Sequence, residues 1–326
     1  MNNEKYWGYL SVIISNSIIG LSFLFTKKAV STTDPYNTLA MRFAISFFVI
    51  FLAAALNLIK LNFKGKDLKK LILLSIFFPS SFFLLQSFGL KWATSSEAGI
   101  ISALTPAMIL VFSILFLKEK VNLKQVLSIM VSICGVVYIF CMKGNVLNLD
   151  NFIGIFLIFL SCVCFAIFSI LSRKCSNDFT PMEICFFMQG FGFILFSSLA
   201  IFRGFNFYEL NSLIKNTSFV TSIIYLAIPS TLFTAILNNY SLSKIEASKV
   251  GVFSNISTII SIIAGALILK EQIMYYHIIG SILIIGGIIG VNCLSSHTTN
   301  NKEEITNNKK KMLKKMRLVA SRINFL

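Results

Sequence analysis

The sequence predicts an all-α integral membrane protein with ten transmembrane helices, arranged as two inverted five-helix repeats around a central cavity. Its 326 residues are 56% hydrophobic and only 13% charged, about half the charged share expected of a soluble domain. Stretches without charge recur at the length of a bilayer span, roughly 20 residues. The second half of the chain also repeats features of the first.

The expected spans come from apolar windows of about 19 residues. Most connections between them are short and polar, so neighbouring helices must run in opposite directions, and no connection is long enough for a soluble domain. In chain order, the expected spans are residues 7–26, 38–59, 71–90, 96–117, 123–142, 152–172, 182–202, 218–238, 248–269 and 275–294.

The distribution of positive charge predicts the orientation. If the N-terminus is cytoplasmic, the cytoplasmic segments carry 21 Lys and Arg and the external loops carry 7. Both termini are therefore expected in the cytoplasm under the positive-inside rule. The tail, residues 309–326, places apolar residues on one helical face and is expected to lie on the anionic inner leaflet. A disordered charge cluster is the alternative, and nucleic-acid binding is not expected.

An internal duplication explains why two apolar segments end in Leu-Lys-Glu. The matching positions lie 146 residues apart near the start of each half, 150 apart in the middle and 152 apart towards the end. The matched pairs are Gly8 with Gly154, Lys27 with Arg173, Pro35 with Pro181, Pro79 with Pro229, Gly99 with Gly251, Glu119 with Glu271, and Gly135 with Gly287.

The repeated unit contains five spans, so the second copy must be inverted in the membrane. Inverted repeats are typical of secondary transporters, in which one part moves against another around a site near the bilayer midplane. We expect residues 1–145 and 146–294 to form the two repeats and residues 295–326 to form the basic tail.

The segment "FGLKWATSSEAGIISALTPAMILVFSILFLKEK" resembles the signature of the drug/metabolite transporter superfamily, in its EamA-type ten-span family. The resembling features are the Ala-Thr-Ser stretch, the Thr-Pro within the span and the Leu-x-Glu ending. The second copy departs from it, with Ser257-Thr258 in place of Thr105-Pro106. The resemblance implies that spans one to four and six to nine surround the cavity, while the fifth and tenth pack outside. It does not choose a substrate.

Polar residues, prolines and aromatic residues at one depth predict the substrate site. Buried polar side chains in a membrane face protein, water or substrate, and a proline within a span frees a carbonyl that must also be satisfied. For each hydroxyl, a bond back to its own helix is the alternative. The candidate substrate-binding residues are Asn16, Ser17, Phe82, Phe83, Gln86, Thr105, Pro106, Cys162, Tyr225, Pro229, Asn255 and Thr258.

Charged residues near the spans are expected to have structural roles. Arg42 lies one turn inside the second span, and its side chain is expected to reach the lipid headgroups, with attraction of a carboxylate as the alternative. Glu119 and Glu271 are expected near the N-terminal end of the helix that follows each, with a gating role as the alternative. Since no Asp or Glu lies near mid-membrane, we expect a neutral or zwitterionic substrate moved by facilitated diffusion or exchange.

These observations predict a secondary transporter for a small organic solute, an amino acid or related metabolite, with export as a candidate direction. A membrane-embedded scaffold or sensor is the alternative. An enzyme is not expected, because the sequence lacks a catalytic or cofactor-binding motif, and no cofactor or metal is expected. The composition is typical of an AT-rich bacterial genome, which places the chain in a bacterial cytoplasmic membrane. The fifth and tenth spans, with Gly286 and Gly290 as a close-contact pair, are expected to pack on each other or to form a homodimer.

Overall fold

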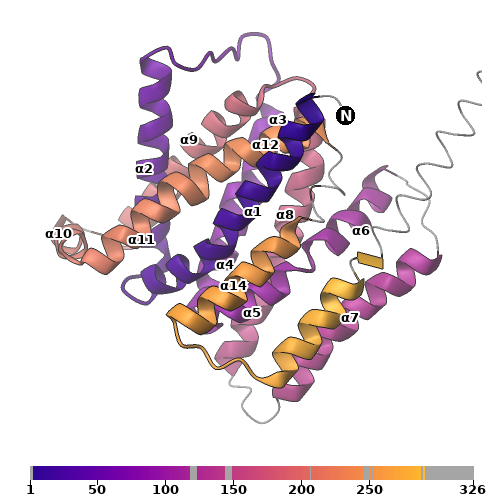
Figure 1. Cartoon of the computed structure of the whole chain (residues 1–326). Helices are drawn as coiled ribbons and strands as arrows, with labels where there is room; N and C mark the ends of the chain where they lie inside the picture. The colour runs from indigo at the N-terminus through magenta and orange to yellow at the C-terminus, as the bar shows by residue number, and fades with distance from the viewer. Residues whose placement is uncertain are drawn as a thin grey trace, which may run out of the picture.

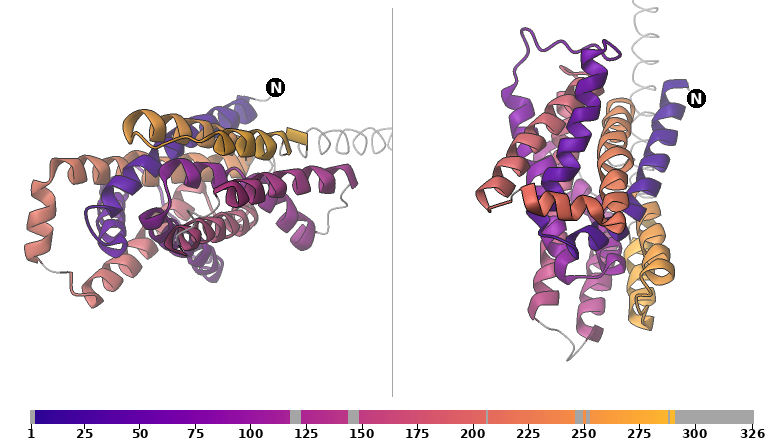
Figure 2. Two further views of the ribbon diagram at one scale, coloured as in Figure 1. Left: turned by 90° about the horizontal axis from the view of Figure 1, so that it is seen from below. Right: turned by 90° about the vertical axis from the view of Figure 1, so that its left-hand side faces the viewer.

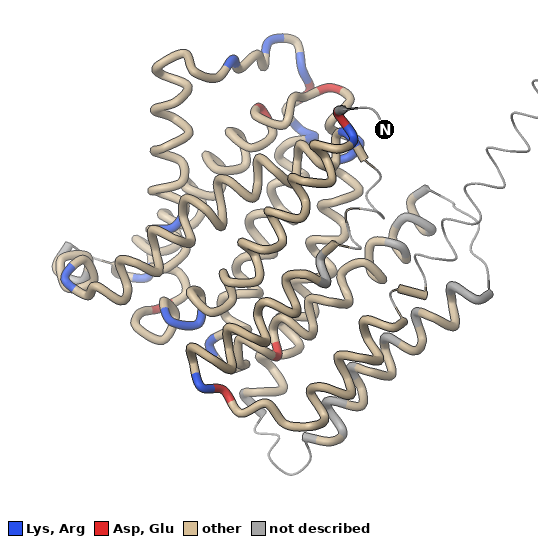
Figure 3. Tube along the Cα trace, in the orientation of Figure 1, with Lys and Arg blue, Asp and Glu red and all other residues tan. Residues whose placement is uncertain are grey.

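The computed structural model is a bundle of helices whose long members run side by side (Figures 1 and 2). The structure describes residues 3–117, 123–143, 149–205, 207–245, 250, 253–287, 289 and 290. Six of the described helices are long and apolar enough to cross a membrane. Lys, Arg, Asp and Glu gather mainly at the helix ends and connections (Figure 3), so few charged residues lie in the middle of the bundle.

The helices of the first half follow the expected spans, with two interruptions. The first span is a single helix of 28 residues, and the third and fourth are each divided. The elements are α1 (Asn3–Val30), α2 (Pro35–Ala55), α3 (Lys69–Ser75), the π-helical segment η1 (Ile76–Ser81), α4 (Phe82–Trp92), α5 (Ser95–Ser102), α6 (Thr105–Leu117) and α7 (Leu123–Lys143).

The second half has the same plan and one additional element. A short helix, α10, lies between the seventh and eighth spans, where the sequence analysis expected only a loop. The elements are α8 (Leu149–Cys175), α9 (Pro181–Phe202), α10 (Phe207–Lys215), α11 (Thr217–Ala227), the π-helical segment η3 (Ile228–Phe233), α12 (Thr234–Lys244), α14 (Ser254–Ile268) and a final helix, Tyr275–Gly287.

The third and eighth spans are interrupted at equivalent places. Pro79 lies in η1 and Pro229 lies in η3, and each proline removes one backbone donor from its helix. Nearby hydroxyls satisfy carbonyls in this region: Ser80 Oγ donates to Ser75 O at 2.7 Å, and Ser81 Oγ donates to Ile76 O at 2.8 Å. In the third span, the expected freed backbone is therefore satisfied within the same span.

Helices of both halves pack around α1. It packs against α14, α12 and α11 of the second half, as well as against α4 and α5 of its own half. The α2 helix packs on α9, and α4 packs on α8. These contacts hold the first four spans of each half together and leave α7 at the edge of the bundle (Figure 1).

The α7 helix packs against the final helix, so the segments expected as the fifth and tenth spans lie side by side. A Cβ atom on Gly135 would lie 2.9 Å from the carbonyl oxygen of Gly280, which shows how closely the two backbones approach. A Cβ atom on Gly290 would lie 2.7 Å from the side-chain hydroxyl of Ser128. Gly286 does not share this interface with Gly290 as expected, because it is exposed and no atom of the described residues lies within 4 Å of its Cβ position.

Two basic side chains bind helix ends at equivalent places in the two halves. Lys27 Nζ donates to the carbonyl oxygen of Ala93 at 2.7 Å, just after α4 ends. Arg173 Nη1 donates to the carbonyl oxygen of Ile245, just after α12 ends. Cations stabilise the C-terminal ends of helices, where carbonyl groups lack partners. Each half thus uses the end of its first helix to bind the end of its third span.

Glu271 binds a different helix end from the one expected. Its carboxylate accepts hydrogen bonds from the backbone N–H groups of Ser95, at 2.8 Å, and Ser96, at 3.0 Å. These groups begin α5, in the first half of the chain, rather than the helix that follows Glu271. The expected location was wrong because loops of the two halves meet here. Glu119 lies outside the described residues.

Candidate functional site

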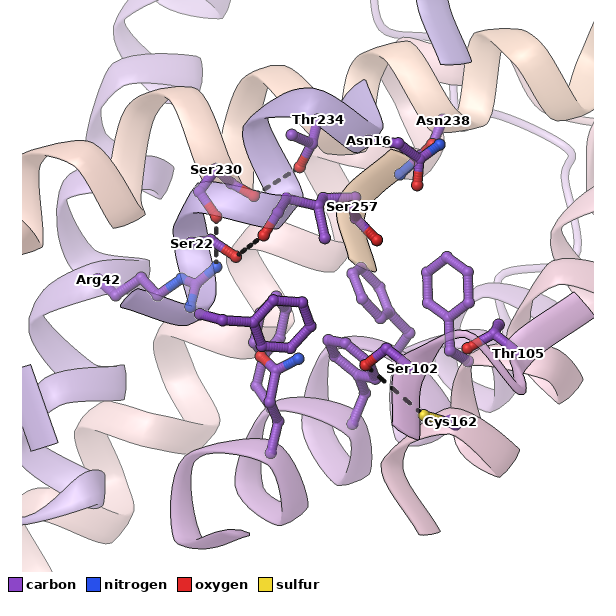
Figure 4. A pocket seen from close by; sticks show the side chains of 17 residues that line it. Asn16, Ser22, Arg42, Ser102, Thr105, Cys162, Ser230, Thr234, Asn238 and Ser257 are labelled. Carbon is purple, nitrogen blue, oxygen red and sulfur yellow. Dashed lines mark hydrogen bonds between the residues drawn. The ribbon is translucent and has the colours of Figure 1, made fainter. Parts of the chain in front are cut away.

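A cavity lies between the two halves, close to the middle of the bundle. About 610 Å³ of space free of protein atoms lies there, part of it open to the solvent. Figure 4 shows Arg42, Ser22 and Ser230 towards one side of it, and Ser102, Thr105 and Cys162 towards the other. The lining residues are Asn16, Ile19, Ser22, Phe23, Arg42, Phe78, Phe82, Phe83, Gln86, Ser102, Thr105, Cys162, Phe165, Ser230, Thr234, Asn238 and Ser257.

Several lining residues occupy equivalent positions in the two halves. At the offset of 146 residues, Asn16 corresponds to Cys162 and Ile19 corresponds to Phe165. At the offset of 152, Gln86 corresponds to Asn238 and Thr105 corresponds to Ser257. All of these residues line the same cavity. The cavity is therefore formed by matching parts of the two halves.

Arg42 is the cationic residue of the cavity, and the expectation that it reaches the lipid headgroups is wrong. Its relative exposure is 2%. Its Nε donates to Thr231 Oγ1, and its Nη2 donates to Ser230 Oγ at 3.1 Å. The guanidinium carbon lies 4.3 Å from the ring centroid of Phe83, in a cation–π contact. The side chain turns inward because η3 places two hydroxyls opposite it.

Aromatic rings form a continuous apolar wall. The ring centroid of Phe78 lies 5.0 Å from that of Phe82, 5.1 Å from that of Phe83 and 5.6 Å from that of Phe165. These rings come from η1, α4 and α8, and they brace one another from both halves. Offset and edge-to-face pairs of this kind hold aromatic rings in defined positions. The wall can accommodate the apolar part of an organic molecule.

Amide side chains supply a neutral polar side to the cavity. Asn16 Nδ2 donates to the carbonyl oxygen of Val12 at 2.8 Å, and Asn238 Oδ1 accepts from Ser15 Oγ at 2.9 Å. Gln86 is 4% exposed and lines the cavity from α4. Among the described residues, those that line the cavity include neither Asp nor Glu. Within the same described part, no group of three His, Cys, Asp or Glu could hold a metal ion.

Comparison with known proteins decides the family. The model of the EamA-like transporter family matches residues 6–141 and again residues 152–293. The chain belongs to the EamA-like transporter family. It is a multi-pass membrane transporter rather than an enzyme, and its two EamA domains correspond to the two halves that share the cavity. The resemblance noted in the sequence is confirmed.

Relatives of this EamA-like transporter cover nearly all of its length. It is 37% identical over 299 residues to the uncharacterized transporter YcxC of Bacillus subtilis (strain 168), covering 90% of this chain and 95% of the relative. An uncharacterized transporter of Archaeoglobus fulgidus is 28% identical, covering 87% of this chain and 97% of the relative. A solved crystal structure with 15% identity superposes with a TM-score of 0.65, covering 90% of this chain and 96% of that one, so the fold is shared.

The structure brings part of the expected site together. Of the residues proposed from the sequence, the cavity is lined by Asn16, Phe82, Phe83, Gln86, Thr105 and Cys162. Pro106, Pro229 and Ser17 are not among the lining residues, and Ser17 Oγ instead donates to Ile13 O at 3.0 Å. The backbone of Asn255 belongs to α14, but its side chain lies outside the described part of the structure.

Tyr225 and Thr258 join helices instead of lining the cavity. The Tyr225 hydroxyl donates to the carbonyl oxygen of Ile18 at 2.9 Å, which connects α11 with α1. Thr258 Oγ1 donates to the carbonyl oxygen of Gly99 at 2.9 Å, which connects α14 with α5. Both bonds cross between the two halves of the EamA-like chain. The sequence marked Thr258 as a polar residue and Tyr225 as an aromatic residue within a span, but it could not separate a helix contact from a cavity wall.

The lining residues that the sequence analysis omitted follow helical spacing from others. On α1, Ile19, Ser22 and Phe23 follow Asn16 at three, six and seven residues. Ser230, Thr234 and Asn238 recur every four residues across η3 and α12. Such spacings place side chains on one helix face. The helical period of the polar residues was therefore the signal that could have found them.

Proposed function

We propose that this chain is a secondary transporter that carries a small organic solute, an amino acid or related metabolite, across the bacterial cytoplasmic membrane by alternating access. Residues 1–145 and 146–294 form two inverted repeats of five spans each, ten spans in total. Both termini face the cytoplasm, the tail of residues 309–326 lies on the anionic inner leaflet, and export is the candidate direction. A homodimer, if formed, would leave each cavity within one chain.

The observation that carries this proposal is that equivalent residues of the two halves line the same cavity. The pairs Gln86 with Asn238 and Thr105 with Ser257 line one space from opposite halves. A site on the axis between inverted repeats can be exposed to either side of the membrane when one part moves against the other. A scaffold or sensor has no need for a paired, partly polar cavity within its bundle.

The matched helix-end contacts support inversion of the repeats. Lys27 and Arg173 occupy equivalent sequence positions, and each binds the end of the third span in its own half. With the cytoplasmic N-terminus that the Lys and Arg distribution favours, the Lys27 contact lies at the outer face and the Arg173 contact at the inner face. In each repeat, a basic side chain would then join the first and third spans at one face of the membrane.

Transport by the purified protein tests this proposal. Proteoliposomes would be offered a labelled pool of amino acids and small metabolites, with and without a pH gradient. We expect saturable flux of at least one solute, and a strong loss of that flux in Asn16→Ala and Gln86→Ala, whose side chains line the cavity. Asn177→Ala is the matched control, because Asn177 is exposed at the end of α8 and does not line this cavity.

The result separates the alternatives. If both cavity variants fold and transport as well as the wild-type protein, the site lies elsewhere. If no solute in any pool is transported, the scaffold or sensor becomes the better explanation. Tight coupling of flux to the pH gradient would count against facilitated diffusion or exchange as the driving mechanism.

A further inference from the structure

We propose that Arg42 binds a carboxylate group of the transported solute, while the apolar body of the solute lies on the phenylalanine wall. This inference rests on the proposed transport function and defines its substrate class as organic carboxylates. Three features of the cavity support it: the burial of Arg42, the N–H donors that remain available on its guanidinium group, and the charge of the remaining cavity wall.

Arg42 is a buried cation whose described partners are all neutral. It is 2% exposed, and its hydrogen bonds go to the hydroxyls of Ser230 and Thr231. Among the ion pairs of the described residues, none includes Arg42. A buried charge without a counter-ion is costly, and charged side chains at membrane depth mark sites for substrates and ions. A bound anion would supply the missing charge.

The anchoring of Arg42 leaves its forked end available. A guanidinium carries five N–H donors, and Thr231 and Ser230 occupy the Nε donor and one Nη2 donor on the same edge. Phe83 covers one face of the group. The remaining Nη1 and Nη2 donors form the fork that binds both oxygens of a carboxylate at once. Arg42 lines the cavity from this position (Figure 4).

The rest of the described wall favours an anion over a cation. Its polar groups are amides, hydroxyls and one thiol, and the lining set contains no carboxylate. An ammonium group would find only neutral acceptors, such as the amide oxygens of Asn16 and Gln86. A carboxylate meets a full positive charge at Arg42. A solute therefore needs a carboxylate to bind at this site. An amino group on the same solute does not prevent binding and is not needed for it.

The phenylalanine wall determines which carbon skeleton the substrate can carry beside its carboxylate. Phe78 and Phe82 lie next to Phe83, which contacts the guanidinium, and Phe165 lies next to Phe78 and Phe82. A solute held by its carboxylate at Arg42 would therefore place its adjacent carbon skeleton against these rings. Contact with apolar surface of this kind stabilises binding in proportion to the area removed from water. Carboxylates with an aromatic or branched aliphatic body fit best.

Direct binding to the purified protein tests this inference independently of transport. Thermal stability in detergent would be measured with 3-phenylpropanoate, 3-phenylpropanamide and 2-phenylethylamine, and with phenylalanine as the carboxylate that also carries an amine. We expect stabilisation by 3-phenylpropanoate and phenylalanine, and none by the amide or the amine. Chloride and phosphate would be tested as inorganic anions and are expected to give a smaller shift than 3-phenylpropanoate.

Variants of Arg42 identify the group that binds. Arg42→Gln is expected to weaken 3-phenylpropanoate binding by at least about 30-fold, as in other losses of a buried charge partner. Arg42→Lys keeps the charge but lacks the fork, so it should bind with intermediate affinity. Arg203→Gln is the matched control, because Arg203 is exposed and lies outside this cavity. Thr231→Val keeps the charge but removes an anchor, so it should also weaken binding.

The possible results are distinct. Equal binding of the amide and the carboxylate, unchanged carboxylate binding in Arg42→Gln, stabilisation by chloride alone, or no stabilisation by any carboxylate would each overturn the assignment. Carboxylate binding that depends on Arg42, together with absence of flux in proteoliposomes, would support the carboxylate site and reject the proposed transport. Flux of a solute without a carboxylate, lost in Asn16→Ala but not in Arg42→Gln, would support the proposed transport and reject the carboxylate site.

Discussion

The carboxylate of Glu271 binds the hydroxyl and the backbone N–H of Ser96, at 2.5 and 3.0 Å. One residue lies after the ninth span and the other opens the fourth, so this contact joins the two halves of the chain. It provides acceptors for the donors that the first turn of α5 leaves unpaired. Gly265 makes room for the contact, since a Cβ there would meet both side chains.

Loss of this contact should destabilise the transporter. Glu271→Ala leaves the N–H groups of Ser95 and Ser96 without their acceptor, and we expect a cost of about 1–3 kcal/mol in the free energy of unfolding. Thermal unfolding in detergent measures it. Glu4→Ala is the control, because the Glu4–Lys244 ion pair is exposed, with 69% of the Glu4 side chain accessible, and such pairs contribute about 0–1 kcal/mol. Equal effects of the two substitutions would contradict the role assigned to Glu271.

Gly99 should be intolerant of any side chain. A Cβ at this position would overlap the side chain of Ser261 on α14, so Gly99→Ala is expected to destabilise the protein by about 1–3 kcal/mol. Gly286→Ala is the matched control: the site is exposed and open, and alanine favours a helix over glycine by up to about 1 kcal/mol. The two substitutions should therefore shift the unfolding temperature in opposite directions. A stabilising Gly99→Ala would mean that α5 and α14 are not in close contact.

Lys27 and Arg173 should contribute separately to stability. Each binds carbonyl groups at the end of a different span, and Lys27→Met and Arg173→Met are each expected to cost about 1–2 kcal/mol. Because the two contacts involve different helix ends, the effects should be additive within about 0.5 kcal/mol. Unfolding of the two single variants and the double variant measures this. Strong non-additivity would show that the two ends are coupled.

Removal of the basic tail distinguishes the transporter from a scaffold. In the proposed function the cavity lies within the helical bundle, so deletion of residues 300–326 should leave flux within about twofold of the full-length protein when both are compared at equal amounts of reconstituted protein. In the proposed function, the tail attracts the chain to the anionic membrane surface. A peptide of residues 309–326 should therefore bind anionic vesicles more strongly than neutral ones. A tail-dependent loss of flux would instead favour the alternative in which the tail is the interaction surface.

The sequence predicted the helices of the protein better than the residues of its candidate site. Pro79 and Pro229, 150 residues apart, were expected within the third and eighth spans, and the structure has each of them in a π-helical segment of its span. Proline acts on its own helix, so its effect can be read locally. The expected role of Thr258 failed for the opposite reason, since its hydroxyl donates to Gly99 on a different helix.

By itself, the sequence determined the apolar segments, the duplication and the polar residues within those segments, because these depend on composition and period along the chain. Only the tertiary structure decided which polar groups face the cavity. Arg42 occupies the same position in its helix whether it reaches the headgroups or turns inward. It turns inward because Ser230 and Thr231, 188 and 189 residues away, lie opposite it with hydroxyls that accept its hydrogen bonds.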